Sequence, residues 1–259
     1  MSAPPLFHLR EGDGRLIVSI PHAGTFLPPD IAATLTPLGR QVIDTDWHVD
    51  RLYGFLAALD VTTIVATHSR TVVDLNRGPD GGKLYPGQAE TGICPTETFD
   101  GAPLYAEARL AASAIGQRIE TYWRPYHDAL AANIARIKAR HGRAILLDGH
   151  SIRAEVPRLF AGTLPDLNFG TNDGASCEAA LAARAFAVVG EDFSKVLNGR
   201  FKGGYITRHY GRPHEDVHTI QLEMTQRSYM LESRPVPYDA DRAEKLISTL
   251  RRLVEALMA

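Results

Sequence analysis

The stretch of sequence that decides the fold is Ala144-Ile145-Leu146-Leu147-Asp148-Gly149-His150-Ser151. Its first four residues are all apolar, without the polar alternation of a strand that has one face in water. A short, continuous apolar run of this kind is typical of a strand that is buried on both faces. It therefore predicts a buried strand over residues 144–148, with polar residues directly at its end.

The rest of the chain alternates between predicted strands and predicted helices. Short apolar runs predict strands over residues 16–20, 61–66, 71–73 and 217–223. Apolar residues at helical spacing predict helices over residues 47–58, 105–122, 126–140, 176–187 and 239–258, with Pro125 separating the second helix from the third. A loop rich in glycine, proline and threonine is predicted over residues 84–103.

This alternation favours an α/β fold with a single domain over residues 1–259. We expect a mixed, mostly parallel central sheet with helices on both faces. No repeat, low-complexity tract or linker in the sequence divides the chain.

The composition is that of an ordinary globular protein, because 44% of the 259 residues are hydrophobic and 22% are charged. The net charge of -2 gives no basic excess, so we expect neither nucleic acid nor a membrane as a partner. The sequence shows neither a signal peptide nor an apolar run long enough to span a bilayer, and its two cysteines are too few for a disulfide framework. These features predict a cytoplasmic protein, a monomer or small homo-oligomer, that acts on a small-molecule substrate.

Polar residues follow the ends of four predicted strands. His22 comes directly after the first strand, His150 comes after the strand that begins at Ala144, and Glu223 ends the last strand. Asn76 and Arg77 follow the remaining one. Because ligands bind beyond the carboxyl ends of the strands in open α/β sheets, we expect these side chains to converge at one edge of the sheet.

Two histidines and one carboxylate around an open fourth position make a catalytic zinc site. His22 and His150 supply the histidines, and Glu223 is suited to act as a general base. No acidic residue lies within three positions of His22, so the third ligand is expected in the acidic cluster Asp44, Asp46 and Asp50. Each histidine taken alone is more typical of a structural role, and it is the joint placement that indicates a metal site.

A second histidine pattern, His214-Glu215-Asp216-Val217-His218, matches the H-E-x-x-H motif of metalloproteases. That motif requires a helix, because only there do histidines four residues apart share a face. Gly211 and Pro213 precede the pattern and β-branched residues follow it, which favours a strand. We therefore expect no metal site here.

Six short motifs occur in this order: Ser19-Ile20-Pro21-His22-Ala23-Gly24, Asp44-Thr45-Asp46-Trp47-His48-Val49-Asp50, Ser69-Arg70 with Asp74-Leu75-Asn76-Arg77, Asp148-Gly149-His150-Ser151, Gly203-Gly204-Tyr205-Ile206-Thr207 and Gln221-Leu222-Glu223. Together they resemble the N-formylglutamate amidohydrolase family over most of the chain, from about Leu16 to Tyr229. The resemblance implies a hydrolase that releases formate and L-glutamate from N-formyl-L-glutamate during histidine degradation.

That family is related in fold to the zinc carboxypeptidases and to aspartoacylase, whose metal ligands are a His-x-x-Glu pair and a later histidine. By this likeness His22 and His150 bind a divalent metal, expected to be Zn²⁺. Thr25 stands where the glutamate would be. The third ligand is therefore expected to be Asp46, with His48 as the alternative.

The likeness also implies roles for residues that bind the substrate. Asn76 and Arg77 would hold its α-carboxylate, and Arg70 would face the developing oxyanion. The substrate has a second carboxylate, and the guanidinium fork of arginine suits such a group. Arg208, with Thr207 beside it, is the candidate that we predict for this side-chain carboxylate, and Arg212 is a further one.

In the mechanism that these residues suggest, Glu223 takes a proton from the attacking water and passes it to the leaving amine. Two alternatives to this function stay open. One is an amidohydrolase that acts on another N-acyl amino acid, and the other is a non-catalytic homologue that binds carboxylates.

Overall fold

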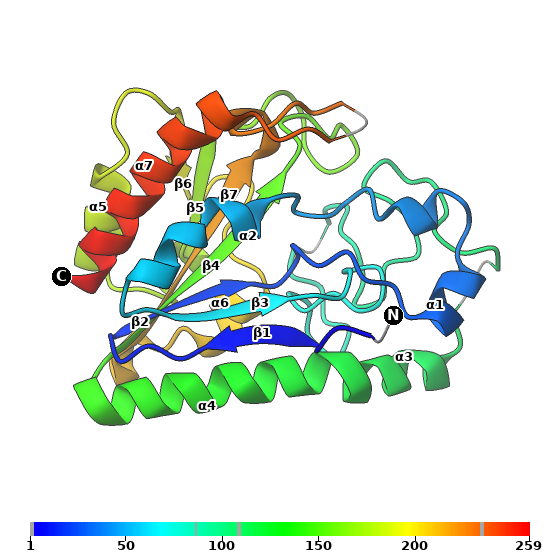
Figure 1. Ribbon diagram of the computed structural model, residues 1–259, viewed down its shortest axis with the longest axis horizontal. Helices are drawn as coiled ribbons and strands as arrows, with labels where there is room; N and C mark the ends of the chain where they lie inside the picture. The colour runs from blue at the N-terminus through cyan, green and yellow to red at the C-terminus, as the bar shows by residue number, and fades with distance from the viewer. Residues whose placement is uncertain (1–2, 86, 108–109, 234–235) are drawn as a thin grey trace.

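The structure is a computed structural model that describes residues 3–85, 87–107, 110–233 and 236–259. Within these residues a sheet of seven strands runs through the molecule in the order β1-β3-β2-β4-β7-β5-β6 (Figure 1). The strands are β1 (Phe7–Arg10), β2 (Leu16–Ile20), β3 (Thr62–Ala66), β4 (Ala144–Ile152), β5 (Leu167–Gly170), β6 (Lys195–Leu197) and β7 (Val217–Thr225).

The centre of this sheet is parallel and its flanks are mixed. β2 pairs in parallel with β3 and with β4, and β4 pairs in parallel with β7. By contrast, β1 and β5 run antiparallel to β3 and β7, while β6 is parallel to β5. The expected mixed, mostly parallel sheet is thus confirmed. The register of β4 and β7 pairs His150 with Glu223, so two predicted site residues are neighbours across the sheet.

The α-helices are α1 (Pro29–Thr34), α2 (Val49–Leu52), α3 (Ala112–Arg118), α4 (Arg124–His141), α5 (Ala179–Ala187), α6 (Tyr205–Tyr210) and α7 (Ala240–Met258). Short 3-10 segments add η1 (Gly39–Gln41), η2 (Gly54–Ala58), η4 (Asn172–Gly174), η5 (Pro213–Glu215) and η6 (Gln226–Ser228), and a π-helical turn, η3 (Ile119–Trp123), joins α3 to α4. α7 begins where the Asp239 side chain accepts a hydrogen bond from the backbone N–H of Arg242, as a helix cap does.

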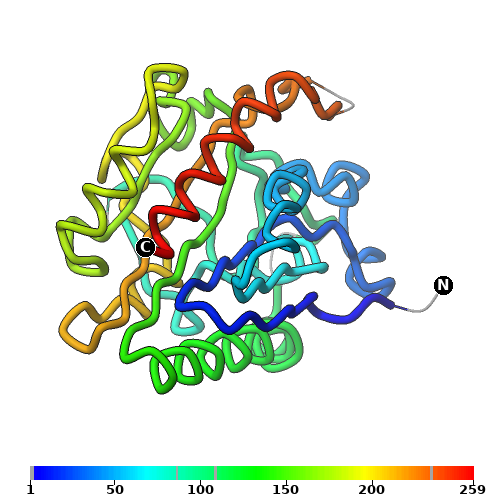
Figure 2. The backbone as a smooth tube through the Cα atoms, turned by 60° about the vertical axis from the view of Figure 1, so that its left-hand side comes forward, coloured from blue at the N-terminus to red at the C-terminus, as the bar shows by residue number. Residues whose placement is uncertain are grey.

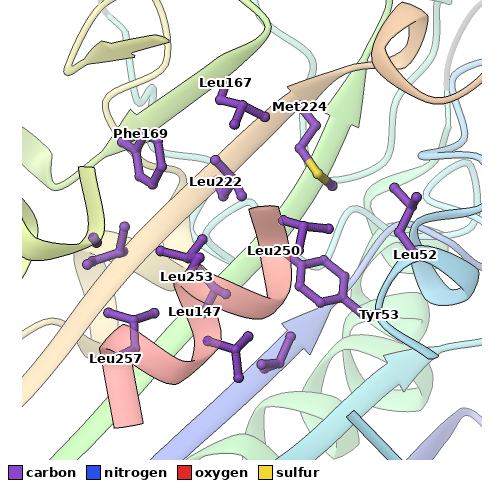
Figure 3. Close-up of a cluster of buried hydrophobic side chains, with 14 of the residues drawn as sticks. Leu52, Tyr53, Leu147, Leu167, Phe169, Leu222, Met224, Leu250, Leu253 and Leu257 are labelled. Carbon is purple, nitrogen blue, oxygen red and sulfur yellow. The ribbon is translucent and has the colours of Figure 1, made fainter. Parts of the chain in front are cut away.

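Helices cover both faces of the sheet, as expected. α4 runs across one face, and α5 and α7 lie on the other (Figures 1 and 2). On the second face, α7 presents Leu250, Leu253 and Leu257 at helical spacing, and these side chains pack with Leu147 of β4 and Leu222 of β7 (Figure 3). Each face of the sheet therefore has its own buried apolar layer, which explains the continuous apolar run of β4.

Two local predictions are wrong. Val72 and Val73 are buried but lie outside the strands, because both edges of the preceding β3 are already paired, with β1 and β2. Pro125 does not interrupt the helix, because it lies at the start of α4 directly after the π-helical turn η3, where the regular hydrogen-bond pattern already changes.

The helix predicted over residues 105–122 begins only at Ala112, and residues 108 and 109 lie outside the described part of the chain. The predicted loop over residues 84–103 contains no helix or strand among its described residues. Among all the residues that the structure describes, none of the helices combines the length and the apolar character needed to cross a membrane.

Candidate active site

A cleft of about 590 Å³, part of it open to solvent, lies at the carboxyl ends of the central parallel strands. His22 follows β2. His150 and Glu223 lie near the carboxyl ends of β4 and β7. All three line the cleft, as do Arg70 and Asn76. The expected convergence of polar residues at one edge of the sheet is therefore found.

Three buried residues, two of which line this cleft, bring potential metal ligands together: His22, Asp46 and His150. The two Nδ1 atoms of the histidines are 3.1 Å apart. Asp46 Oδ2 lies 3.1 Å from Nδ1 of His150 and 3.8 Å from Nδ1 of His22. Asp46 is held by the backbone, since its N–H donates to the His22 carbonyl and its Oδ2 accepts from the N–H of Ser151.

Carboxylates on the far side of each imidazole fix how the two rings are turned. Nε2 of His22 lies 2.8 Å from Asp74 Oδ1, and Nε2 of His150 lies 2.8 Å from Asp148 Oδ2. The guanidinium of Arg70 donates to Nδ1 of His22, so that nitrogen is an acceptor and the proton of the ring is on Nε2. Histidines that bind metals are commonly oriented by such outer carboxylates.

The three residues fit a divalent cation. Two imidazole nitrogens and one carboxylate oxygen are the donor set of many catalytic zinc sites, and tetrahedral bonds of about 2.0–2.1 Å would separate the ligand atoms by about 3.3 Å. The observed separations of 3.1, 3.1 and 3.8 Å lie around that value. The alternative ligand His48 is outside the group, because its Nε2 contacts the Val236 carbonyl, and Thr25 is exposed.

Charges around the group set unusual protonation states. Burial lowers the pKa of His150, but the charge of Asp148 and the hydrogen bonds to Asp148 and Asp46 outweigh it and raise that pKa well above the ordinary value. Burial raises the pKa of Asp46, yet the Arg70 guanidinium beside it brings the net pKa far below the usual range. A cation that binds here must therefore displace a proton from His150.

Glu223 has the opposite shift. Burial raises its pKa to about 8, with the negative charges of Asp46 and Asp148 adding to the effect while His150 and Arg70 oppose it. Gln221 Nε2 donates to Glu223 Oε2 across 3.2 Å, and the carboxyl group lines the cleft. A carboxyl with a pKa near neutrality can accept and return a proton at the pH of a cell, which is the property of a general base.

Arg70 belongs to the same buried network. Its Nη2 donates to Asp46 Oδ1 across 2.7 Å, and its Nη1 is 3.9 Å from Asp74 Oδ2. These carboxylates outweigh the effect of burial and raise the pKa of the guanidinium, which stays charged. Its charge faces the cleft, where the ring of Phe99 lies 5.2 Å from the guanidinium carbon.

The segment that contains Arg70, Asn76 and Arg77 has no strand partner, and side chains hold it from outside. Asn76 is fixed by a bond from the Ile206 N–H to its Oδ1, and its Nδ2 lies 2.9 Å from Nε2 of His150. Four backbone carbonyls of the segment accept hydrogen bonds from side chains that lie outside it. The carbonyl of Thr71 accepts from Tyr105 (3.0 Å), that of Val72 from Arg118 (3.2 Å), that of Leu75 from His127 (2.9 Å) and that of Arg77 from Trp123 (3.0 Å).

Two residues predicted to bind substrate are not brought to the cleft. Thr207 and Arg208 lie in α6 and are not among the residues that line it, and Arg208 Nε donates instead to the Gly203 carbonyl. The glycines before α6 have another role, because a Cβ on Gly204 would lie 2.4 Å from Asn76 Nδ2. The motif therefore contributes this close approach and the backbone N–H groups of Tyr205 and Ile206, which donate to Asn76.

Sequence reasoning missed Arg200, which lines the cleft from the segment between β6 and α6. Only its position shortly before the Gly203-Gly204 pair could have drawn attention to it. The two histidines of the H-E-x-x-H pattern do not share a helix, since His214 lies exposed in η5 while His218 is in β7 and contacts Arg143.

Comparisons with known proteins show which family the chain belongs to. The family model for N-formylglutamate amidohydrolase matches residues 14–230. The chain is 49% identical to an N-formylglutamate deformylase of Pseudomonas aeruginosa (96% of this chain, 95% of the relative) and 44% identical to one of Pseudomonas putida (98% and 95%).

Solved structures show the same fold. An N-formylglutamate amidohydrolase from Ralstonia eutropha superposes with a TM-score of 0.82 at 27% identity, covering 96% of each chain. A protein of Agrobacterium tumefaciens superposes with a TM-score of 0.75 at 16% identity, covering 98% of this chain and 95% of its own, and shows the fold alone.

Proposed function

Since the chain belongs to the N-formylglutamate amidohydrolase family, we propose that it hydrolyses N-formyl-L-glutamate to formate and L-glutamate. The observation that carries the proposal is the pairing of a buried His-Asp-His group with Glu223, whose pKa is raised to about 8, in one cleft. A metal-ligand set beside a carboxyl that can exchange a proton is the arrangement used for hydrolysis of amides.

We assign His22, Asp46 and His150 as ligands of a divalent metal and infer that the metal is Zn²⁺, on the basis of the nitrogen-rich donor set and the burial of the three residues. When bound, the cation supplies positive charge that polarises the formyl carbonyl and makes water more acidic. Asp74 and Asp148 keep the two imidazoles turned so that their Nδ1 atoms face each other and Asp46.

Glu223 moves the protons of the reaction. It takes a proton from the water whose oxygen forms the new bond to the formyl carbon. When the bond between that carbon and the amide nitrogen breaks, Glu223 gives the proton to the nitrogen, and L-glutamate leaves as a free amine. A raised pKa suits both transfers, because the carboxyl must be a base in the first step and an acid in the second.

Arg70 and the Asn76-Arg77 pair bind negative charge. The Arg70 guanidinium faces the cleft and stabilises the oxygen of the tetrahedral intermediate, an interaction whose loss typically costs on the order of 3–4 kcal/mol. We assign the α-carboxylate of the substrate to Asn76 and Arg77, which both line the cleft. Asn76 lies beside the His22-Asp46-His150 group, because its side chain contacts His150.

We further infer that the reaction serves histidine degradation in the cytoplasm. The resemblance to that branch of the family supports the first part. Two free, buried cysteine thiols are in keeping with the second.

The proposal is tested by a substrate panel: release of formate or acetate from N-formyl-L-glutamate, N-formyl-L-methionine, N-acetyl-L-glutamate and N-acetyl-L-aspartate. We expect the highest kcat/KM on N-formyl-L-glutamate. A higher kcat/KM on either acetyl substrate would assign the chain to a different N-acyl amino acid. No turnover of any compound by protein that contains its metal would refute the proposed reaction.

A further inference from the structure

We propose that Arg200 binds the side-chain carboxylate of the substrate and thereby selects an acidic amino acid. The inference rests on the proposed function and assigns a residue that the sequence did not single out. Arg200 lines the cleft together with the Asn76-Arg77 pair and Glu223, and it comes from a different segment of the chain.

Two of the three arginines that line the cleft have no close carboxylate partner among the described residues. Arg70 is already paired with Asp46 and Asp74. Among the described residues, no carboxylate lies within 4.0 Å of the guanidinium nitrogens of Arg77 or Arg200, although both line the cleft. A ligand with two carboxylates would supply one partner for each. The number of cleft arginines without an ion pair thus matches the number of carboxylates on an N-acyl glutamate, while Glu90 and Glu223, which also line the cleft, act on Arg200 only at longer range.

Contacts hold the Arg200 side chain in place, but one of its guanidinium nitrogens lacks a hydrogen-bond partner. Its Nε donates to the Leu159 carbonyl across 2.9 Å and its Nη2 to the Ala89 carbonyl across 3.3 Å. The rings of Tyr85 and Phe201 lie 5.0 and 5.2 Å from the guanidinium carbon. Its Nη1 is buried and has no hydrogen-bond partner. Burial lowers the pKa of this guanidinium, so an anion that reached Nη1 would supply both a hydrogen-bond acceptor and a compensating charge.

The positions of the two arginines decide which carboxylate each one binds. The α-carboxylate is attached to the carbon that bears the scissile amide, so it must stay close to the metal group. Arg77 follows Asn76, whose Nδ2 lies 2.9 Å from Nε2 of His150. The contacts of Arg200 are with Leu159, Ala89, Tyr85 and Phe201, all outside that group. Arg200 is therefore placed for the end of the longer side chain.

The experiment compares two nearly isosteric substrates, N-formyl-L-glutamate and N-formyl-L-glutamine, in Arg200→Met and wild-type protein. Losing one partner of a buried charged pair predicts a fall of about 100-fold in kcat/KM on the glutamate substrate. On the glutamine substrate kcat/KM should change by less than about fivefold, since its neutral amide forms no ion pair with Arg200 that the variant could lose. Arg200→Lys should recover part of the selectivity, because it keeps the charge without the bidentate fork.

Arg252→Met, on the exposed side of α7, is the matched control for loss of an arginine, and thermal unfolding of each variant checks that it folds. An equal loss on both substrates in Arg200→Met would show that Arg200 only supports the shape of the cleft, and would overturn the proposal. A selective loss in Arg208→Met instead of Arg200→Met would assign the carboxylate to Arg208 and overturn it as well.

Failure of the proposed function would be recognised separately, because wild-type protein would then release formate from neither substrate. In that case calorimetric binding of glutarate, a dicarboxylate without an amide, tests Arg200 directly. Binding at least about tenfold weaker in Arg200→Met than in wild type would support the assignment. Equal affinity in the two proteins would refute it.

Discussion

Replacing Glu223 with glutamine is expected to stabilise the chelator-treated protein at alkaline pH while leaving its stability at acidic pH almost unchanged. The pKa of Glu223 rises from 4.5 to about 8 on folding, chiefly because the carboxyl is buried. Between these two values the folded protein retains a proton that the unfolded chain releases. The free energy of unfolding contributed by this group therefore decreases as the pH rises through that interval.

The magnitude follows from the width of the interval. At about 1.4 kcal/mol per pH unit, the interval from 4.5 to about 8 corresponds to a penalty on the order of 5 kcal/mol, fully developed above pH 8 and absent below pH 4.5. Glutamine has nearly the same shape and no proton to lose, so Glu223→Gln removes the penalty. The variant should be more stable than wild type by several kcal/mol at about pH 8.5 and by little at about pH 5.

Urea unfolding of both proteins at these two pH values, with chelator present, measures the difference. Titrating groups far from Glu223 contribute equally to both proteins and cancel when the variant is compared with wild type. The same difference in the free energy of unfolding at both pH values would refute the raised pKa of Glu223 in the folded protein. Repeating the series with Zn²⁺ is an internal control, because a nearby cation should lower the pKa of Glu223 and reduce the stabilisation.

Three further predictions concern the residues around the metal group. Because Asp148 and Asp46 raise the pKa of His150, zinc uptake should release a proton. The binding enthalpy measured by calorimetry should then change with the ionisation enthalpy of the buffer. A binding enthalpy that is the same in all buffers would contradict the proton release. Asp148→Asn should weaken zinc affinity by about 10–100-fold in competition with a chelating dye, and unchanged affinity would show that the carboxylate does not orient His150. Gly204→Ala places a Cβ 2.4 Å from Asn76 Nδ2, so kcat/KM on N-formyl-L-glutamate should fall by about tenfold or more, and wild-type kcat/KM in a folded variant would contradict the close approach.

The centre of the fold and of the site could be predicted from the sequence because both depend on local signals. The apolar run that begins at Ala144 is a strand covered on both faces, and the polar residues at its end reach the carboxyl edge of the sheet. Because ligands bind beyond the carboxyl ends of parallel strands, the sequence predicts the convergence of His22, His150 and Glu223, and all three line one cleft.

The periphery could not be predicted, because its structure depends on partners far along the chain. Val72 and Val73 have the composition of a strand, but the neighbouring strand edges are taken, and side chains from the α3–α4 region bind their segment instead. Arg200 lies in an irregular segment without periodicity, and only its spatial approach to the cleft distinguishes it from other arginines. Arg208 has a comparable sequence position, but its guanidinium bonds to the Gly203 carbonyl.

The most direct test of the central claim is formate release from N-formyl-L-glutamate by one preparation of the protein, assayed as purified, after chelation, and after addition of one equivalent of Zn²⁺. Glu223→Gln is assayed in parallel, with the metal content of every sample determined. We expect chelation to abolish turnover and Zn²⁺ to restore it, and we expect Glu223→Gln to hold as much zinc as wild type while releasing almost no formate. Undiminished turnover by protein shown to be free of metal, or by Glu223→Gln, would contradict the account.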